Sequence, residues 1–288
     1  MRNRERAAVL LRLLRNARYE VLPTAKIEGI VATHVPVGRT VTVTASPAKG
    51  LEATLALTER LSGLGYDAVP HLAARMVSGR TELVEIVERL KASGVRTVFM
   101  PAGDADPPAG PYVGALDLLK ELDDLGNPFA DVGITGYPES HPSIHDDVTI
   151  QAMWDKRRHA TQIVSNLTFD PAALATWVRR LRARGVTIPV LVGLPGPVER
   201  TKLLSMATKI GVGESTKFLA KNRGMFARIA APGGYDPLRF LGKAAAVLGD
   251  PAMAVPGLHV FTFNQVAETE AWRDEQLELL GERASSAP

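Results

Sequence analysis

Short runs rich in β-branched and aromatic residues recur along this chain, and segments with helical periodicity separate most of them. Eight such runs occur, at 19–24, 40–45, 68–73, 97–103, 131–138, 161–166, 188–195 and 258–264. Alternation of strands and helices is typical of a parallel sheet, because each parallel connection has to cross back over the sheet. Eight repeats over about 250 residues favour a closed (β/α)8 TIM barrel over an open doubly wound sheet. The first run is not followed by G-x-G-x-x-G, which disfavours a Rossmann dinucleotide site.

The segments between the predicted strands also carry the end signals of helices. In "RTELVEIVERLKASG" the apolar residues recur at helical spacing, and Gly94 provides a C-terminal stop. In "DPAALATWVRRLRARG", Asp170 is a predicted N-cap, Pro171 takes the first helical position and Gly185 ends the helix. These signals support the α/β assignment independently of the strand count.

The chain is predicted to form a single barrel domain over residues 1–288. Residues 1–18 predict an N-terminal helix rather than a signal peptide, because Arg12 interrupts the apolar run. The leucines expected to face the core are Leu10, Leu11, Leu13 and Leu14. The region 200–256 predicts two or three extra helices between strands 7 and 8, and 280–288 predicts a frayed tail.

Composition excludes several classes of site and partner. The chain has no cysteine, which excludes disulfides, thiolate nucleophiles and cysteine-based metal sites. Lys and Arg number 34 against 31 Asp and Glu, and no basic run alternates with aromatics, so we expect no nucleic-acid partner. No stretch approaches the roughly 20 apolar residues of a membrane span, so we expect no membrane partner and a cytoplasmic location. The oligomeric state stays open between a monomer and a small homo-oligomer.

Polar residues stand where the predicted strands end, which is where barrel enzymes place their active sites. They are Glu20, Thr44, His71, Asp104, Tyr137, Asn166 and Asn264, with Gln265 following the last. Apolar and aromatic neighbours disfavour the charged form of Glu20, so we expect a raised pKa and an acid role near neutral pH. The open alternatives are a Glu20 paired with an arginine and an Asp104 that merely shapes a turn.

The strongest candidate for a metal site is the segment "GYPESHPSIHDD". His141 and His145 are four residues apart and Asp146 follows, but the Pro-Ser context is typical of a loop, which weakens a shared helical face. We expect no metal, and a metal-dependent lyase or hydrolase is the alternative from another class. His71 either binds a ligand or only forms a hydrogen bond to the backbone. Asn166 and Asn264 either bind a flat heterocycle or cap the next helix.

Taken in order, the strand-end motifs resemble those of the methylenetetrahydrofolate reductase family. "YEVLP" resembles its F-E-F-F-P, "VPHLA" its P-H-L-T, "PAGD" its R-G-D, "VSNLTFD" its I-T-Q-F-F-F-D, "VGLPGP" its G-I-L-P-V and "FTFN" its Y-T-L-N. "GYPESHP" matches Y-P-E-x-H-P, which is the most specific of the set. The matches keep their order over residues 19 to 265, and the family fold is a (β/α)8 barrel.

The resemblance implies reduction of 5,10-methylenetetrahydrofolate to 5-methyltetrahydrofolate. Glu20 matches the family's general acid, which opens the ring to an N5 iminium cation, and Asp104 matches the aspartate that stabilises this cation. The implied substrate-binding residues are Thr44, Tyr137, Asn166, Asn264 and Gln265. The implied cofactor-binding residues are His71, Gly103, Tyr112, His141 and Leu194. Asn166 replaces a family glutamine, which keeps the amide but shortens its reach.

Departures from the family motifs concern the flavin that members usually carry. Ala102 replaces the arginine before Gly-Asp, and Trp154 and Asp155 stand near the expected basic pair, which a one-residue gap restores in part through Lys156. Flavin phosphates need charge-assisted donors. The pattern resembles the divergent actinobacterial branch, so we expect NADH as co-substrate, direct hydride transfer and no flavin. An ordinary flavin-dependent reductase, NADPH in place of NADH, and a non-catalytic folate-binding barrel stay open.

Overall fold

A computed structural model describes residues 3–139, 146–197 and 235–286 of the chain and shows eight parallel strands in one sheet. The strands are β1 (Ala17–Val21), β2 (Thr40–Val43), β3 (Asp67–Pro70), β4 (Thr97–Phe99), β5 (Asp131–Gly136), β6 (Gln162–Ser165), β7 (Val190–Pro195) and β8 (Gly257–Phe261). Their order is β3-β2-β1-β8-β7-β6-β5-β4. A bridge between His71 and Phe99 joins the two ends, with Leu72 N donating to Phe99 O at 2.8 Å. The predicted barrel is confirmed.

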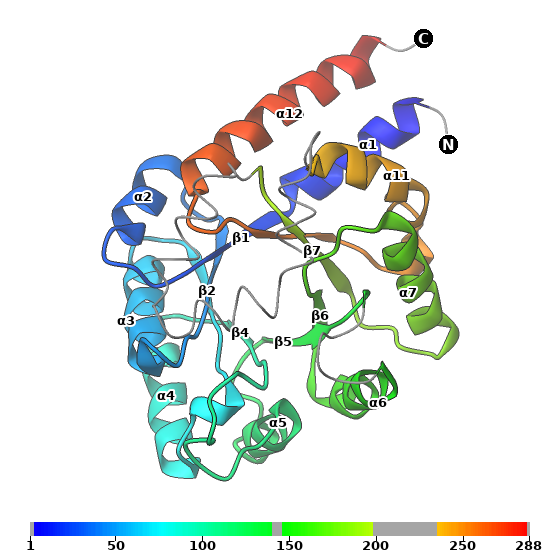
Figure 1. Cartoon of the computed structure of the whole chain (residues 1–288). Helices are drawn as coiled ribbons and strands as arrows, with labels where there is room; N and C mark the ends of the chain where they lie inside the picture. Colours follow the sequence, from blue (N-terminus) through cyan, green and yellow to red (C-terminus); the bar gives the residue numbers. More distant parts are fainter. Residues whose placement is uncertain (1–2, 140–145, 198–234, 287–288) are drawn as a thin grey trace.

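Helices surround the strands on the outside of the barrel (Figure 1). They are α1 (Asn3–Arg15), α2 (Ile27–His34), α3 (Gly50–Gly63), α4 (Arg80–Ala92), α5 (Ala115–Asp124), α6 (Asp146–Lys156), α7 (Pro171–Ala183), α11 (Pro237–Leu248) and α12 (Val266–Ser286). Short 3-10 turns lie at Ala74–Met76, Arg157–His159 and Pro251–Met253. None of the helices in the described ranges has the length and apolar character needed to cross a membrane.

The predicted helix-end signals of α4 and α7 act as expected. Asp170 Oδ1 accepts from the backbone N–H groups of Ala172 and Ala173 at 2.8 and 3.2 Å, with a proline at the first helical position. Gly94 and Gly185 adopt φ angles of +76° and +78° just beyond the two helices, a conformation that glycine reaches without steric cost. Local sequence therefore determines where these helices stop.

The two ends of the chain differ in part from expectation. All four predicted leucines of α1 are buried, but the helix ends at Arg15 and β1 already begins at Ala17, inside the predicted 1–18 segment. Most of the extra helices predicted in 200–256 lie outside the described residues, and α11 is the one described. Where a frayed tail is predicted from 280, the structure continues α12 as helix to Ser286. α12 packs beside α1 (Figure 1).

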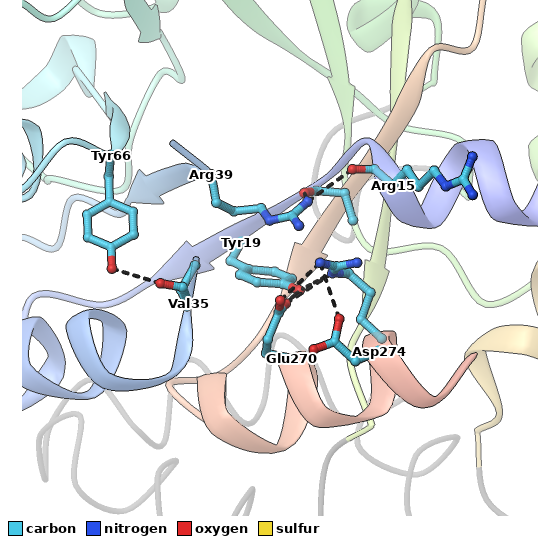
Figure 2. Close-up of polar contacts among 9 residues, drawn as sticks. Arg15, Tyr19, Val35, Arg39, Tyr66, Glu270 and Asp274 are labelled. Atoms are coloured by element: carbon cyan, nitrogen blue, oxygen red, sulfur yellow. Dashed lines mark hydrogen bonds and ion pairs between the residues drawn. The ribbon is translucent and has the colours of Figure 1, made fainter. Parts of the chain in front are cut away.

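The side chains of β1 alternate between the outside and the inside of the barrel, as a strand requires. Tyr19 points outward and its hydroxyl contacts Glu270 of α12 (Figure 2). Arg18 points inward, because its Nη1 reaches Gln162 Oε1 on β6, at 3.3 Å, and β6 is not a neighbour of β1. Glu20, two residues on, shares the inward face. A small apolar cluster of Val69, Phe99, Val164 and Leu191 fills part of the interior.

Candidate active site

Glu20 lies inside the barrel at the C-terminal end of β1, between two histidines. His259 Nε2 of β8 is 2.9 Å from Glu20 Oε2, and His71 Nε2 is 3.5 Å from the same oxygen. The Glu20 side chain is 13% exposed, against 1% for His259 and 10% for His71. A carboxyl group with limited access to solvent and two imidazole neighbours is thus present at the end of the barrel where the sequence predicts the active site.

A buried arginine stands behind this group. Arg18 Nε donates to His259 Nδ1 at 3.0 Å, and the arginine is only 6% exposed. Sequence reasoning did not single out Arg18 or His259. The available signal was the two-residue spacing of Arg18 and Glu20, which puts both on one face of a strand. For His259 the signal was an imidazole within the apolar run "LHVF".

Burial governs the protonation of these residues. Desolvation raises the pKa of Glu20 above its ordinary value, and the nearby His71 and Arg18 only partly oppose it. Desolvation lowers the pKa of His71 to about 4 and holds the pKa of His259 well below its ordinary value. Both histidines are therefore neutral at neutral pH and bring no positive charge to Glu20. The alternative of a Glu20 paired with an arginine is not seen as a direct contact, since His259 lies between Glu20 and Arg18.

The turn after β8 fastens the end of β1. Asn264 Oδ1 accepts from Leu22 N at 2.7 Å, and Asn264 Nδ2 donates to Leu22 O and to Thr24 Oγ1, both at 3.1 Å. Thr262 Oγ1 donates to Glu20 O at 2.6 Å. The amide predicted to bind substrate thus already has three bonds within the chain. Asn264 is at φ +59°, a region that asparagine tolerates better than most residues.

Gly103 and Asp104 follow β4 in a loop at the same end of the barrel. Gly103 has φ +85°, and a Cβ at this position would lie 2.8 Å from Ala73 Cβ, so the turn requires glycine. Arg75 holds the loop, because its Nε donates to Ala105 O at 2.6 Å and its Nη2 pairs with Asp106 at 3.2 Å. The Asp104 side chain is exposed. The loop therefore presents Asp104 toward solvent from a fixed turn.

The motif "GYPES" begins at the end of β5, and its Glu139 contacts the loop that follows β6. Glu139 accepts from the backbone N–H of Asp170 at 2.6 Å and from that of Phe169. This carboxylate therefore positions the start of α7. Asn166 is exposed, and its Oδ1 accepts from Leu167 N at 2.8 Å. Tyr137 is half-buried beside this loop.

The remaining predicted residues vary in their exposure. Thr44 is half-buried after β2, and its carbonyl accepts from Thr54 Oγ1 at 2.8 Å. Gln265 is 5% exposed, and its carbonyl accepts from Thr269 Oγ1 at 2.7 Å in the first turn of α12. Tyr112 and Leu194 are 4% and 0% exposed and belong to the core, and their role in cofactor binding stays a prediction. His141 lies outside the described residues.

Lys156 and Arg157, two of the basic residues near the expected flavin site, are engaged within the protein, whereas Arg158 is exposed. Arg157 lies over the Trp154 ring, 3.4 Å from its centroid, so Trp154 stacks with a cation and does not only pack a helix face. Lys156 is 7% exposed, its Nζ lies 3.4 Å from Thr135 Oγ1, and desolvation lowers its pKa to about 8. Neither Lys156, at the end of α6, nor Arg157, in the 3-10 turn that follows, extends freely into solvent.

The grouping of possible metal ligands and a cavity at the other end of the barrel bear on alternative sites. Within the described residues, no three His, Asp or Glu side chains are grouped as metal ligands, and the predicted pair His141 and His145 lies outside those residues. A cavity of about 580 Å³ opens at the N-terminal mouth of the barrel, opposite Glu20. Its wall includes the first residues of six strands, Ala17, Thr40, Asp67, Thr97, Asp131 and Gln162.

Comparison with known proteins gives a family and a fold. The family model for methylenetetrahydrofolate reductase matches residues 22–214. Methylenetetrahydrofolate reductase 2 of Saccharomyces cerevisiae is 26% identical over 145 residues, which cover 46% of this chain and 24% of the yeast protein. Probable methylenetetrahydrofolate reductase (NADPH) of Caenorhabditis elegans is 26% identical over 139 residues, covering 45% of this chain and 20% of the nematode protein. The matched stretch is thus at most a quarter of either relative.

Solved structures with the same architecture are remote in sequence. Oxaloacetate acetylhydrolase bound to oxalate aligns with a TM-score of 0.51 at 13% identity, covering 99% of this chain and 90% of the other. The structure of 2,3-dimethylmalate lyase aligns with a TM-score of 0.50 at 12% identity, covering 96% and 88%. At such identities the alignments support the barrel fold and carry no information on the reaction.

Proposed function

Because this chain belongs to the methylenetetrahydrofolate reductase family, we propose that it reduces 5,10-methylenetetrahydrofolate to 5-methyltetrahydrofolate with NADH. The observation that carries the proposal is the buried Glu20 at the C-terminal end of β1. It stands in the motif "YEVLP", which resembles the one that carries the family's acid, and it lies between two neutral imidazoles. Substrate and nicotinamide would bind at this end of the barrel.

Glu20 supplies the proton that the first step needs. Protonation of N10 by Glu20, directly or through one water, breaks the bond from N10 to the methylene carbon and leaves an N5 iminium cation. The raised pKa of Glu20 keeps the acid protonated to a higher pH than an exposed carboxyl. Burial thus serves the chemistry, although it disfavours the ionised carboxylate left after transfer.

Hydride transfer completes the reaction. The hydride leaves C4 of NADH and adds to the iminium carbon, giving the 5-methyl group and NAD⁺. An iminium accepts hydride readily, so the protein has mainly to hold the two rings in contact and exclude water. Asp104, on its rigid turn, is the negative charge proposed to stabilise the cation.

The proposal includes direct hydride transfer from NADH to the folate without a flavin. Ala102 is exposed where the family carries an arginine, Arg157 is stacked on Trp154, and Lys156 is buried against Thr135. Arg158 is the exposed cation of this basic run, so a flavin phosphate would find fewer charge-assisted donors here than the family motif supplies, and these residues do not fit that cofactor well. This arrangement supports direct transfer from NADH over a flavin relay.

An absorbance spectrum of purified protein, followed by assay in the same cuvette, tests the proposal. We expect no flavin bands, loss of NADH absorbance only after methylenetetrahydrofolate is added, and a smaller rate with NADPH. Bands near the flavin maxima that bleach with NADH alone would establish the ordinary flavoenzyme instead. If NADH is not consumed after methylenetetrahydrofolate is added, whether or not flavin is also added, the proposed reductase activity is rejected.

A further inference from the structure

Three inward-facing side chains form a hydrogen-bonded series through the barrel. Arg18 Nε donates to His259 Nδ1 at 3.0 Å, and His259 Nε2 lies 2.9 Å from Glu20 Oε2. Arg18 and His259 are 6% and 1% exposed, so bulk water does not compete for either bond. The series runs along β1 and β8 and connects the N-terminal half of the barrel with the proposed acid.

The chemistry of arginine decides where His259 carries its hydrogen. A guanidinium has only N–H donors and keeps its charge in proteins, so His259 Nδ1 must act as the acceptor. The neutral imidazole then carries hydrogen on Nε2, and this N–H donates to Glu20 Oε2. Protonation of Nδ1 would break the bond to Arg18 and place two cations side by side, which agrees with the lowered pKa of His259.

The two carboxyl oxygens of Glu20 are therefore not equivalent. Oε2 receives the His259 N–H, and the contacts of the Glu20 carboxyl group within the described part of the chain all involve Oε2, none of them Oε1. His71 Nε2, at 3.5 Å from Oε2, is beyond ordinary hydrogen-bond length. An oxygen that already accepts an N–H is the poorer position for a proton. We propose that Arg18 and His259 are positioning residues that place the acidic proton of Glu20 on Oε1, the oxygen available to substrate.

Among the groups around the series, Arg18 is the one that sets the tautomer of His259. The other groups that face the series are His71, directly after β3, Gln162 of β6 and Phe261 of β8. The carboxylates of Asp67 and Asp131 act on Arg18 from the starts of β3 and β5. His71 is neutral because burial lowers its pKa to about 4. Burial is the larger cause of the lowered pKa of His259 and the Arg18 charge is the second, so loss of that charge would make His259 Nδ1 easier to protonate.

The inference rests on the proposed function for the use of the proton, but its first test does not need the reaction. Long-range ¹H–¹⁵N correlation of protein labelled with ¹⁵N-histidine distinguishes the two neutral tautomers and the imidazolium. Comparison with His259→Gln assigns the signals of His259. We expect the Nε2–H tautomer, without titration between about pH 5 and pH 8. An Nδ1–H tautomer, or an imidazolium in that range, would overturn the proposal.

Variants of Arg18 test the consequence for Glu20. Arg18→Met removes the donor, so His259 should titrate and pair with the Glu20 carboxylate. That pairing favours the ionised acid, and the alkaline limb of the kcat profile should move to lower pH by about one unit or more. Arg18→Lys retains a cationic donor and should restore the profile in part. A folded Arg18→Met with an unshifted profile and an unchanged His259 tautomer would contradict the proposal.

Variants of His259 separate positioning from simple packing. The amide of His259→Gln can accept from Arg18 and donate to Glu20, whereas His259→Leu can do neither. We expect the glutamine variant to retain roughly tenfold more turnover than the leucine variant; equal losses in two folded proteins would count against the proposal. A wild-type protein with the expected tautomer but no folate-dependent oxidation of NADH would reject the proposed function and leave the positioning inference standing.

Discussion

Tyr19 and Glu20 are adjacent in β1, yet their side chains lie on opposite sides of the barrel wall. The Tyr19 hydroxyl contacts Glu270, and Arg273 Nε donates to the same hydroxyl at 3.1 Å (Figure 2). Glu20 meets His259 inside the barrel. Burial and Glu270 raise the pKa of Tyr19, so the phenol stays a donor to that carboxylate. The outward contact to α12 thus helps to hold the strand that aims Glu20 inward.

Glu20→Gln should abolish most turnover and keep folate binding. The amide preserves the size of the side chain but cannot give up a proton to N10, and general acid catalysis commonly contributes about 10²–10⁴-fold. Steady-state assays with NADH, together with a folate-binding titration, check the result. Turnover within about threefold of wild type would remove Glu20 from the acid role.

Asp104→Asn should lower kcat by roughly tenfold or more, because a neutral amide stabilises the iminium cation less well than a carboxylate. Asp124→Asn, at an exposed position on α5, is the matched control and should leave kcat unchanged. If the two variants behave alike, Asp104 has only a role in the turn.

Tyr19→Phe should destabilise the fold without changing a residue of the active site. Glu270 and Arg273 are 4% and 5% exposed, so the lost hydroxyl leaves charged groups short of a partner, and we expect a loss of about 1.5–3 kcal/mol. The comparison variant is Tyr66→Phe, which loses a bond to the neutral Val35 O at 2.9 Å and should cost about 1 kcal/mol. Denaturant unfolding of both proteins measures the difference, and a reversed order would contradict the contribution assigned to the ion pair.

Asn264→Ala should reduce both stability and turnover, since it removes three hydrogen bonds to the β1 end and strains a residue at φ +59°. Asn264→Gly relieves the backbone strain and removes the same amide. We expect the glycine variant to recover stability by about 1 kcal/mol over alanine while kcat stays low. Recovery of kcat in the glycine variant would show that backbone conformation, and not the amide, positions Glu20.

The raised pKa of Glu20 also predicts how stability depends on pH. Between the ordinary carboxyl value of 4.5 and the higher folded value, the native protein binds more protons than the unfolded chain, so this group's contribution falls as pH rises. Glu20→Gln should therefore gain stability relative to wild type as pH rises above 4.5 and lose that advantage at lower pH. Unfolding curves across this range test the sign, and a constant difference would contradict it.

Sequence reasoning was most successful for elements with local causes. All eight strands lie where β-branched runs predict them, and Asp170, Gly94 and Gly185 act at the predicted helix ends. Glu20 and the order of the family motifs were also recognised from sequence. Helix length was less well predicted, since α12 continues to Ser286 beyond the point where its own sequence favours fraying.

The individual side-chain roles at the site depended on contacts between distant parts of the chain. Asn264, predicted to bind substrate, has its amide bonded to Leu22 just after β1, and Tyr112 and Leu194, predicted to bind a cofactor, lie in the core. These binding roles stay predictions. The types of these residues are compatible with ligand binding and with a structural role, and only their contacts in the folded protein distinguish the two.

The sequence by itself determined the barrel class, the strand positions and the family, because periodicity, caps and motifs involve residues a few positions apart. The tertiary structure alone decided that Arg18 and Glu20 share His259, from which they are 241 and 239 residues distant in sequence. Pairing of β1 with β8 in one register brings these side chains together. A partner so far away leaves no local periodic signal, and the burial that perturbs the pKa of Glu20 exists only once the barrel has closed.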